Sequence, residues 1–200
     1  MNNKFDLGRR QFLSHALATT AVAVLETRRS HAQTPGNGHD GKIYPPRPVP
    51  DIPLRCDDGT STRMATLLHG KATALHLVFT QCTTTCPIQG AIFEKVQGLL
   101  PDQTKHSVQL LSLSIDPESD TPEALHLWLQ RFHGRPGWIA AAPRIEDLPA
   151  IRSFFGDGDR AVGNHITQVQ IIDRNGALIW RTFDLPSPES IASMLRMIDV

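Results

Sequence analysis

Two cysteines, Cys82 and Cys86, are the residues of this chain whose types and spacing could do chemistry. Three threonines separate them, and they lie between an apolar run that ends at Phe79 and a helix-like pattern that starts at Pro87. Two thiols at such a turn can close a disulfide, attack another disulfide, or hold a soft metal ion as thiolates. The pair alone leaves these three roles open, so the surrounding elements have to decide among them.

Strand and helix patterns alternate around the pair. The spacing of Ile88, Ile92, Val96 and Leu99 predicts a helix directly after the cysteines, with Pro87 in its first turn. Apolar runs and turn residues predict the other elements. Strands are expected at 54–56, 74–79, 108–115, 138–141, 168–172 and 178–182, and further helices at 122–132 and 145–155, followed by a final helix that carries residues 191–198.

Local signals fix several ends of these elements. Thr121 followed by Pro122 predicts a helix start, with Leu125, Trp128, Leu129 and Phe132 on one apolar face. Asp57-Asp58-Gly59 and Arg174-Asn175-Gly176 are typical of hairpin turns. The final helix is expected to place Ile191, Met194, Leu195 and Ile198 on one face.

This order of elements predicts an α/β, thioredoxin-like fold: a central mixed sheet flanked by helices, with an N-terminal β extension. The thiol pair then lies where that fold keeps its active site. A helix N-terminus offers unpaired N–H groups and a positive dipole end, which both favour thiolate over thiol. Four residues of helix rise about 6 Å, so a reversible disulfide is also sterically possible.

The N-terminal segment, residues 1–32, is typical of a twin-arginine export signal. Arg9-Arg10 precede an apolar stretch of about ten residues, and Ser30-His31-Ala32 has the form of a peptidase site. We therefore expect a periplasmic protein that starts near Gln33. The stretch is too short to span a bilayer comfortably, and an uncleaved signal is the one way in which the chain is expected to meet a membrane.

The charge and the length of the exported part limit its possible functions and its number of domains. Without residues 1–32 the chain keeps 15 basic and 18 acidic side chains, which argues against a nucleic-acid-binding surface. Residues 33–53 are rich in Pro and Gly, and we interpret them as an extended tether that contributes no regular ladder. Residues 54–200 are then long enough for one domain with a full core.

Three motifs resemble those of the Sco/SenC family of copper proteins. They are Phe79-Thr80-Gln81-Cys82 to Cys86-Pro87, the run 114–123 with sequence SIDPESDTPE, and Asn164-His165 before a strand that ends in Asp173-Arg174-Asn175-Gly176. The resemblance runs from about residue 54 to the C-terminus. The spaced cysteines alone are a weak signal, and the combination of all three motifs is a strong one.

The resemblance implies a thioredoxin-fold metallochaperone that binds one copper and helps to load cytochrome c oxidase. The metal ligands that it implies are Cys82, Cys86 and His165. Two thiolates and an imidazole suit Cu(I) and can also hold Cu(II), whereas Mg²⁺ and Ca²⁺ prefer oxygen ligands. The partners that follow are a copper donor, a thiol reductant and a copper-accepting protein such as an oxidase subunit.

The chain departs from the family pattern at two places. Thr83-Thr84 stand where members commonly carry Pro-Asp, so a like charge near the thiolates is absent and the loop is less restrained. Asn164 stands where an Asp commonly precedes the histidine. These departures bear more on service to cytochrome oxidase than on copper binding.

Two alternatives stay open beside the metal site. The pair Cys82 and Cys86 could be a structural disulfide in an exported domain, or the attacking and resolving thiols of a thiol–disulfide oxidoreductase. Among the other candidates, His126 and His133 are expected to be surface residues, and Cys56 a small buried apolar residue.

Overall fold

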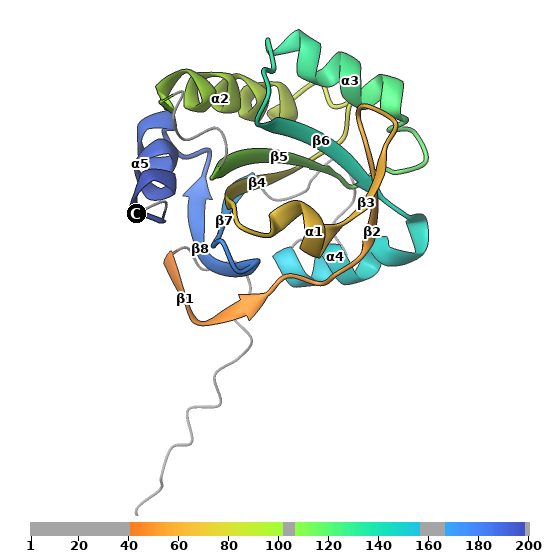
Figure 1. Ribbon diagram of the computed structural model, residues 1–200. Coiled ribbons are helices and arrows are strands. Elements are labelled where there is room, and N and C mark those ends of the chain that lie inside the picture. Colours follow the sequence, from red (N-terminus) through yellow and green to blue (C-terminus); the bar gives the residue numbers. More distant parts are fainter. Residues whose placement is uncertain (1–40, 102–106, 157–166, 199–200) are drawn as a thin grey trace, which may run out of the picture. The chain divides into compact units, whose positions relative to one another are not determined.

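The computed structural model describes residues 41–101, 107–156 and 167–198, in which eight strands form one mixed sheet (Figure 1). The strand order is β1-β8-β7-β4-β5-β6-β2-β3. The strands are β1 (Gly41–Pro48), β2 (Pro53–Cys56), β3 (Ser61–Arg63), β4 (Ala72–Val78), β5 (Val108–Ser114), β6 (Trp138–Pro143), β7 (Gln168–Ile172) and β8 (Ala177–Asp184). The helices are α1 (Met64–Leu68), α2 (Thr85–Leu99), α3 (Pro122–Arg131), α4 (Leu148–Phe155), which follows a short 3-10 turn at Ile145–Asp147, and α5 (Pro188–Ile198).

The centre of the sheet positions the cysteine loop. β4 runs parallel to β5, and β5 parallel to β6, while β7 pairs with β4 in the antiparallel sense. Because the carboxyl ends of parallel strands meet at one edge, the loops that follow β4 and β5 start side by side. The backbone bond from Ile115 N to Val78 O, at 2.9 Å, ties their first residues together.

Each face of the sheet has its own apolar core. Figure 1 shows α2, α3 and α5 over one face and α1 and α4 over the other. Alternate residues of β4 serve the two cores, because side chains along a strand point to opposite faces: Ala74 and Val78 pack under α2, and Leu75 and Leu77 pack on the opposite side. Both faces of the central strands are therefore covered, which explains their continuous apolar runs.

The structure confirms most of the predicted elements. Each expected strand and helix is present within a few residues of its predicted bounds. Thr121 caps α3 by accepting a hydrogen bond from Ala124 N, with Pro122 behind it. Asn175-Gly176 makes the turn between β7 and β8, where Gly176 has φ +78°, a conformation that other L residues rarely adopt.

The predicted apolar face of α2 was right in the middle, where Val96 is buried and Ile92 packs against the core, and wrong at both ends. Ile88 and Leu99 are 49% and 42% exposed, whereas the buried side of the helix carries Gln89, Phe93 and Gln97. The two glutamines are buried because each reaches a backbone carbonyl that apolar residues could not satisfy. Apolar spacing alone therefore misplaced the ends of the stripe.

The prediction that residues 33–53 contribute no ladder was also wrong for part of that range. β1 pairs with β8, although the register shifts between Lys42 and Arg47. Proline is tolerated there because β1 is an edge strand and the shift leaves Pro45 and Pro46 out of the ladder. Residues 33–40 lie outside the described part of the chain.

The predicted export signal at 1–32 lies outside the described residues too. None of the helices in the described ranges combines the length and the apolar character that a bilayer crossing requires.

Candidate metal centre

The two cysteines meet at the N-terminus of α2. Cys82 lies in the loop after β4, and Cys86 is in the first turn of the helix. The backbone N–H of Cys86 donates to the Cys82 sulfur at 3.4 Å, and the Thr84 hydroxyl lies 3.6 Å from the same sulfur. The Cys82 sulfur therefore occupies the place of a capping group, where unpaired N–H groups and the helix dipole favour an anion.

The two thiols have opposite electrostatic environments. Burial alone would raise the pKa of Cys82, but hydrogen bonds from the backbone and side chains of Cys86 and Thr84 outweigh it and lower the pKa to about 7. For Cys86, burial dominates and raises the pKa well above its ordinary range, and the charges of Cys82 and Asp120 add to the effect. Both thiols are buried, and neither is in a disulfide bond. Cys82 is thus the more nucleophilic sulfur, and Cys86 is the protected one.

A buried carboxylate holds the loop that leads to Cys82. Asp120 accepts hydrogen bonds from Thr80 N at 2.9 Å and from Thr80 Oγ1 at 2.6 Å, and from Ser114 Oγ at 2.6 Å. Its side chain is fully buried. Burial raises the pKa of Asp120 despite these three bonds. The loop after β5 and the loop after β4 are therefore joined through one acidic side chain.

A buried glutamine ties the start of β7 to the same helix. Gln89, one turn beyond Cys86, donates from Nε2 to the carbonyl oxygen of Thr167 at 3.0 Å. The predicted ligand His165 lies outside the described residues, two positions before Thr167. Thr167 is therefore anchored against the helix that carries Cys86.

The donor set suits a soft metal ion. Two sulfur atoms share one hydrogen-bonding network at the mouth of α2, and thiolates select Cu(I) or Zn²⁺ over Mg²⁺ and Ca²⁺. Among the described residues no group of three or more His, Cys, Asp or Glu side chains is arranged to hold a metal. A third ligand would therefore have to come from outside them, and the assignment of His165 stays a prediction.

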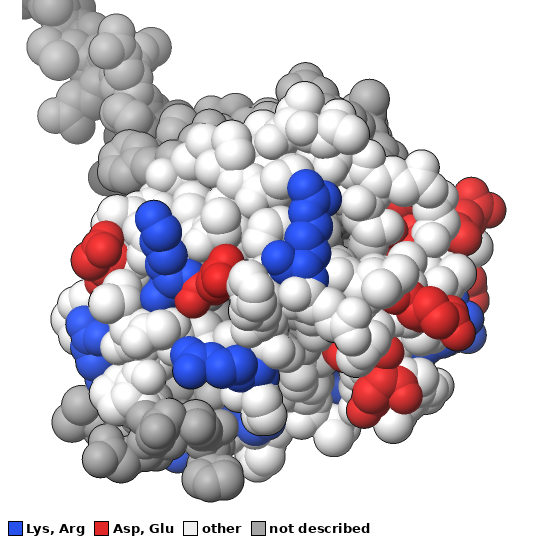
Figure 2. Space-filling view, turned by 90° about the horizontal axis from the view of Figure 1, so that it is seen from above, with Lys and Arg blue, Asp and Glu red and all other residues white. Residues whose placement is uncertain are grey.

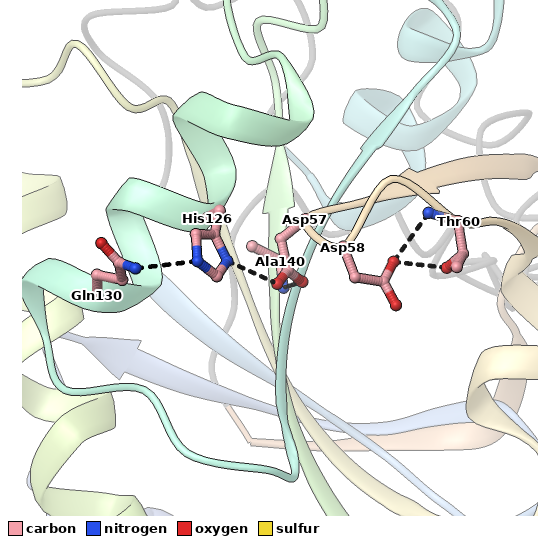
Figure 3. Close-up of polar contacts among 6 residues, drawn as sticks. All are labelled: Asp57, Asp58, Thr60, His126, Gln130 and Ala140. Atoms are coloured by element: carbon pink, nitrogen blue, oxygen red, sulfur yellow. Dashed lines mark hydrogen bonds and ion pairs between the residues drawn. The ribbon is translucent and has the colours of Figure 1, made fainter.

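The other candidate histidines are surface residues, as expected. His126 on α3 lies with Nδ1 3.8 Å from Asp57 Oδ2, while its Nε2 is 3.0 Å from Gln130 Nε2 (Figure 3). Asp57 in turn accepts from Ala140 N, and Asp58 is occupied by Thr60 (Figure 3). His126, Gln130, Asp57 and Asp58 line an open groove. Each of these side chains contacts a different partner, so they do not converge on one point as metal ligands would.

Two further predictions concern single residues. His133 pairs with Glu94 at 2.8 Å and is 82% exposed, so it does not combine with His126. Cys56 is 5% exposed and free, and burial raises its pKa. The structure therefore confirms Cys56 as a small buried residue.

The charged side chains on the face shown in Figure 2 are of both signs. Figure 2 looks at the molecule from above the view in Figure 1, and separate Lys or Arg and Asp or Glu side chains stand there among uncharged ones. Such a mixture gives no strong attraction for a partner of either charge.

Comparison with known proteins decides the family. The SCO1/SenC family model matches residues 56–198. This chain belongs to the SCO1/SenC family. The match includes the cysteine loop, Asp120 and the β7 hairpin, so all three motifs of the sequence lie within the family's domain.

Individual relatives are distant. A protein of Stutzerimonas stutzeri, whose name proposes copper binding, is 26% identical over 141 residues, 66% of this chain and 67% of that protein. Among solved structures, a SCO1/SenC family lipoprotein from Bacillus anthracis is 24% identical with a TM-score of 0.66, covering 79% of this chain and 99% of that one. Copper-bound ScoI of Bradyrhizobium japonicum is 21% identical with a TM-score of 0.63, covering 76% and 99%. These structures confirm the predicted thioredoxin-like α/β fold.

The sequence placed Thr80 and Asp120 in motifs of the family resemblance but gave neither of them a role at the site. The 116–122 segment was interpreted as a helix start that could also shape the mouth of the cysteine loop, and Gln89 carried no recognisable pattern. The signal available for Asp120 was an acidic residue soon after β5, a strand that the structure buries completely.

Proposed function

We propose that this protein is a periplasmic copper-binding metallochaperone that assists copper delivery to cytochrome c oxidase. Copper is its cargo, held by Cys82, Cys86 and His165. The observation that carries the proposal is the pair of cysteines at the N-terminus of α2, which form no disulfide and in which the backbone nitrogen of Cys86 lies 3.4 Å from the Cys82 sulfur. Membership of the family and copper-bound structures of family members support it.

The two thiols would take different parts in loading. Cys82, whose pKa is lowered to about 7, presents a thiolate to an incoming copper ion at neutral pH. Cys86 has a raised pKa, so it gives up its proton only as the metal binds, because metal binding to thiols releases protons. Three ligands leave a coordination position open, through which a donor or acceptor protein can exchange the ion.

The periplasmic location and the acceptor follow from sequence features and family membership. The twin-arginine segment at 9–10 supports export. Thr83, Thr84 and Asn164 replace residues that the family commonly carries, so the surface offered to an acceptor differs from the common pattern. Fractionation of the native cell, followed by detection of the protein, tests the location.

The decisive experiment is metal retention by the purified, fully reduced protein. We expect one copper per chain to survive a modest chelator, near-complete loss in Cys82→Ser, and weaker retention of Cu(II) in His165→Ala. His126→Ala is the matched control, because that imidazole lies in the separate groove with Asp57. A reduced wild-type protein that loses its copper to the chelator would overturn the proposal.

The opposite environments of the thiols favour a second candidate, a thiol–disulfide oxidoreductase. The Cys82 thiolate would attack a substrate disulfide, forming a mixed disulfide and releasing one substrate thiolate. Cys86, losing its proton to that thiolate, would then attack the Cys82 sulfur and release the second thiolate, leaving a Cys82–Cys86 disulfide. Rapid reduction of a model disulfide that is unchanged in His165→Ala would favour this role.

A further inference from the structure

The Asp120 carboxylate lies next to the dithiol without belonging to any ligand set. Resting on the proposed function, we infer that Asp120 is a positioning residue whose buried charge biases the dithiol site toward Cu(II) and against Cu(I). It would also fix the loop from which Cys82 projects.

The backbone places the carboxylate close to the sulfur atoms. Asp120 Oδ1 accepts from Thr80 N, and the Cys86 sulfur is hydrogen-bonded to the backbone of Phe79, the preceding residue. Consecutive Cα atoms are about 3.8 Å apart, so the two acceptors are attached to neighbouring peptide groups. The charge of Asp120 in turn contributes to the raised pKa of Cys86.

The carboxylate is held in place by donors alone. Its three hydrogen bonds come from an amide and two hydroxyl groups, Thr80 Oγ1 and Ser114 Oγ, and no salt bridge to it occurs within the described ranges. The side chain is 0% exposed. A buried charge that no described side chain neutralises acts on its surroundings with little screening by solvent.

The sign of the bias follows from the charge of the loaded site. Two thiolates, a neutral imidazole and Cu(I) carry a net charge of about −1, whereas the same ligands around Cu(II) are neutral. A neighbouring carboxylate repels the first complex and hardly affects the second. At an effective dielectric constant of about 20, unit charges as far as about 10 Å apart still interact strongly enough to change a binding ratio about tenfold.

The test compares Cu(I) and Cu(II) affinities of the wild type and Asp120→Asn, each measured with a competing chelator. Asn can accept both Thr80 donors and donate to Ser114, so it keeps the shape of the contact and removes the charge. We expect the ratio of Cu(I) to Cu(II) affinity to rise about tenfold, which corresponds to about 59 mV in the potential of the bound copper. Should Asp120→Asn fail to fold, Asp120→Ser carries the same prediction.

Two control variants separate charge from positioning. Ser114→Ala removes one hydrogen bond and keeps the carboxylate, and Glu118→Gln neutralises an exposed acid in the same loop. Neither should move the ratio. An unchanged ratio in Asp120→Asn, or an equal loss of both affinities, would overturn the inference while the proposed function stood. A wild-type protein that holds neither ion would overturn the proposed function itself.

Discussion

Each end of α2 carries a buried glutamine that donates a hydrogen bond to a distant backbone carbonyl, but the two glutamines differ in how many of their polar atoms are paired. At the C-terminal end, Gln97 donates to Arg135 O at 2.9 Å and accepts from Arg135 N at 3.0 Å, so both its polar atoms are used. At the N-terminal end, Gln89 donates to Thr167 O, but its buried Oε1 has no hydrogen-bond partner among the described residues. The end that carries the cysteines thus keeps spare bonding capacity.

This difference distinguishes the structural contact of Gln97 from the contact that Gln89 makes beside the candidate metal site. Buried polar groups are nearly always satisfied, so an exception calls for a reason. Near the N-terminal end the buried Gln89 Oε1, the capping sulfur of Cys82 and the Asp120 carboxylate, which pairs with no described cation, occur together. Near the C-terminal end, Gln97 uses both of its polar atoms in hydrogen bonds.

The largest expected effect comes from the glycines of α2. A Cβ added to Gly90 would overlap the ring of Phe132, which is buried against α3. Gly90→Ala should therefore destabilise the fold toward the upper end of about 1–3 kcal/mol. Gly98, nearer the C-terminal end, has nothing within 4 Å of such a Cβ, so Gly98→Ala should be neutral or stabilise by about 0.5–1 kcal/mol. Denaturant unfolding of both variants checks the pair, and equal effects would contradict the packing.

Replacement by leucine should affect the two glutamines differently: mainly the stability at Gln97, and mainly the copper affinity at Gln89. Gln97→Leu loses two buried hydrogen bonds and should cost about 2 kcal/mol of stability, with copper affinity unchanged. Gln89→Leu loses one bond and also removes an unpartnered acceptor, so it should cost about 1 kcal/mol or less. Because it releases Thr167, it should weaken copper retention at least several-fold. Unfolding curves and chelator competition on the same samples measure the stability and the copper affinity of both variants. A loss of copper affinity in Gln97→Leu would contradict the difference between the two ends of the helix.

A smaller effect is the pH dependence that Cys82 contributes. Its pKa is lowered to about 7 in the folded protein, below the value of about 8.5 for an unfolded chain. The unfolded state then binds more protons between these values, so the reduced protein should gain stability as pH rises from about 7 to 8.5 and lose it as pH falls through 7. Cys82→Ser should lack this gain. Unfolding of both proteins at several pH values under reducing conditions measures it, and parallel profiles would refute the lowered pKa.

Much of the fold could be predicted because its signals are local. Thr121-Pro122 marks a helix start and Asn175-Gly176 a hairpin turn whatever surrounds them. The ends of the buried face of α2 could not be predicted, since Gln89 and Gln97 are buried through carbonyls of Thr167 and Arg135 far along the chain. β1 was missed because prolines forbid a ladder only where their nitrogen must donate, and an edge strand with a register shift avoids that.

The site divides in the same way. Cys82 and Cys86 were predicted from their spacing, since four residues place one just before a helix and the other in its first turn. Asp120 and Thr80 are 40 residues apart, and only the parallel pairing of β4 with β5 brings their loops together. No pattern along the sequence shows that Thr80 and Asp120 are in contact. The hydrogen bonds that support the cysteine loop were therefore visible only in the structure.

The smallest expected effect belongs to the surface near the C-terminal half of α2. His133 pairs with Glu94 at 2.8 Å, and their side chains are 82% and 41% exposed. Exposed pairs of this kind contribute about 0–1 kcal/mol because solvent screens them and two side chains must be ordered. His133→Ala should therefore change the unfolding free energy by less than about 0.5 kcal/mol and leave copper retention unchanged. A loss of copper in this variant would show that the two ends of the helix are coupled, and the division of labour between them would have to be abandoned.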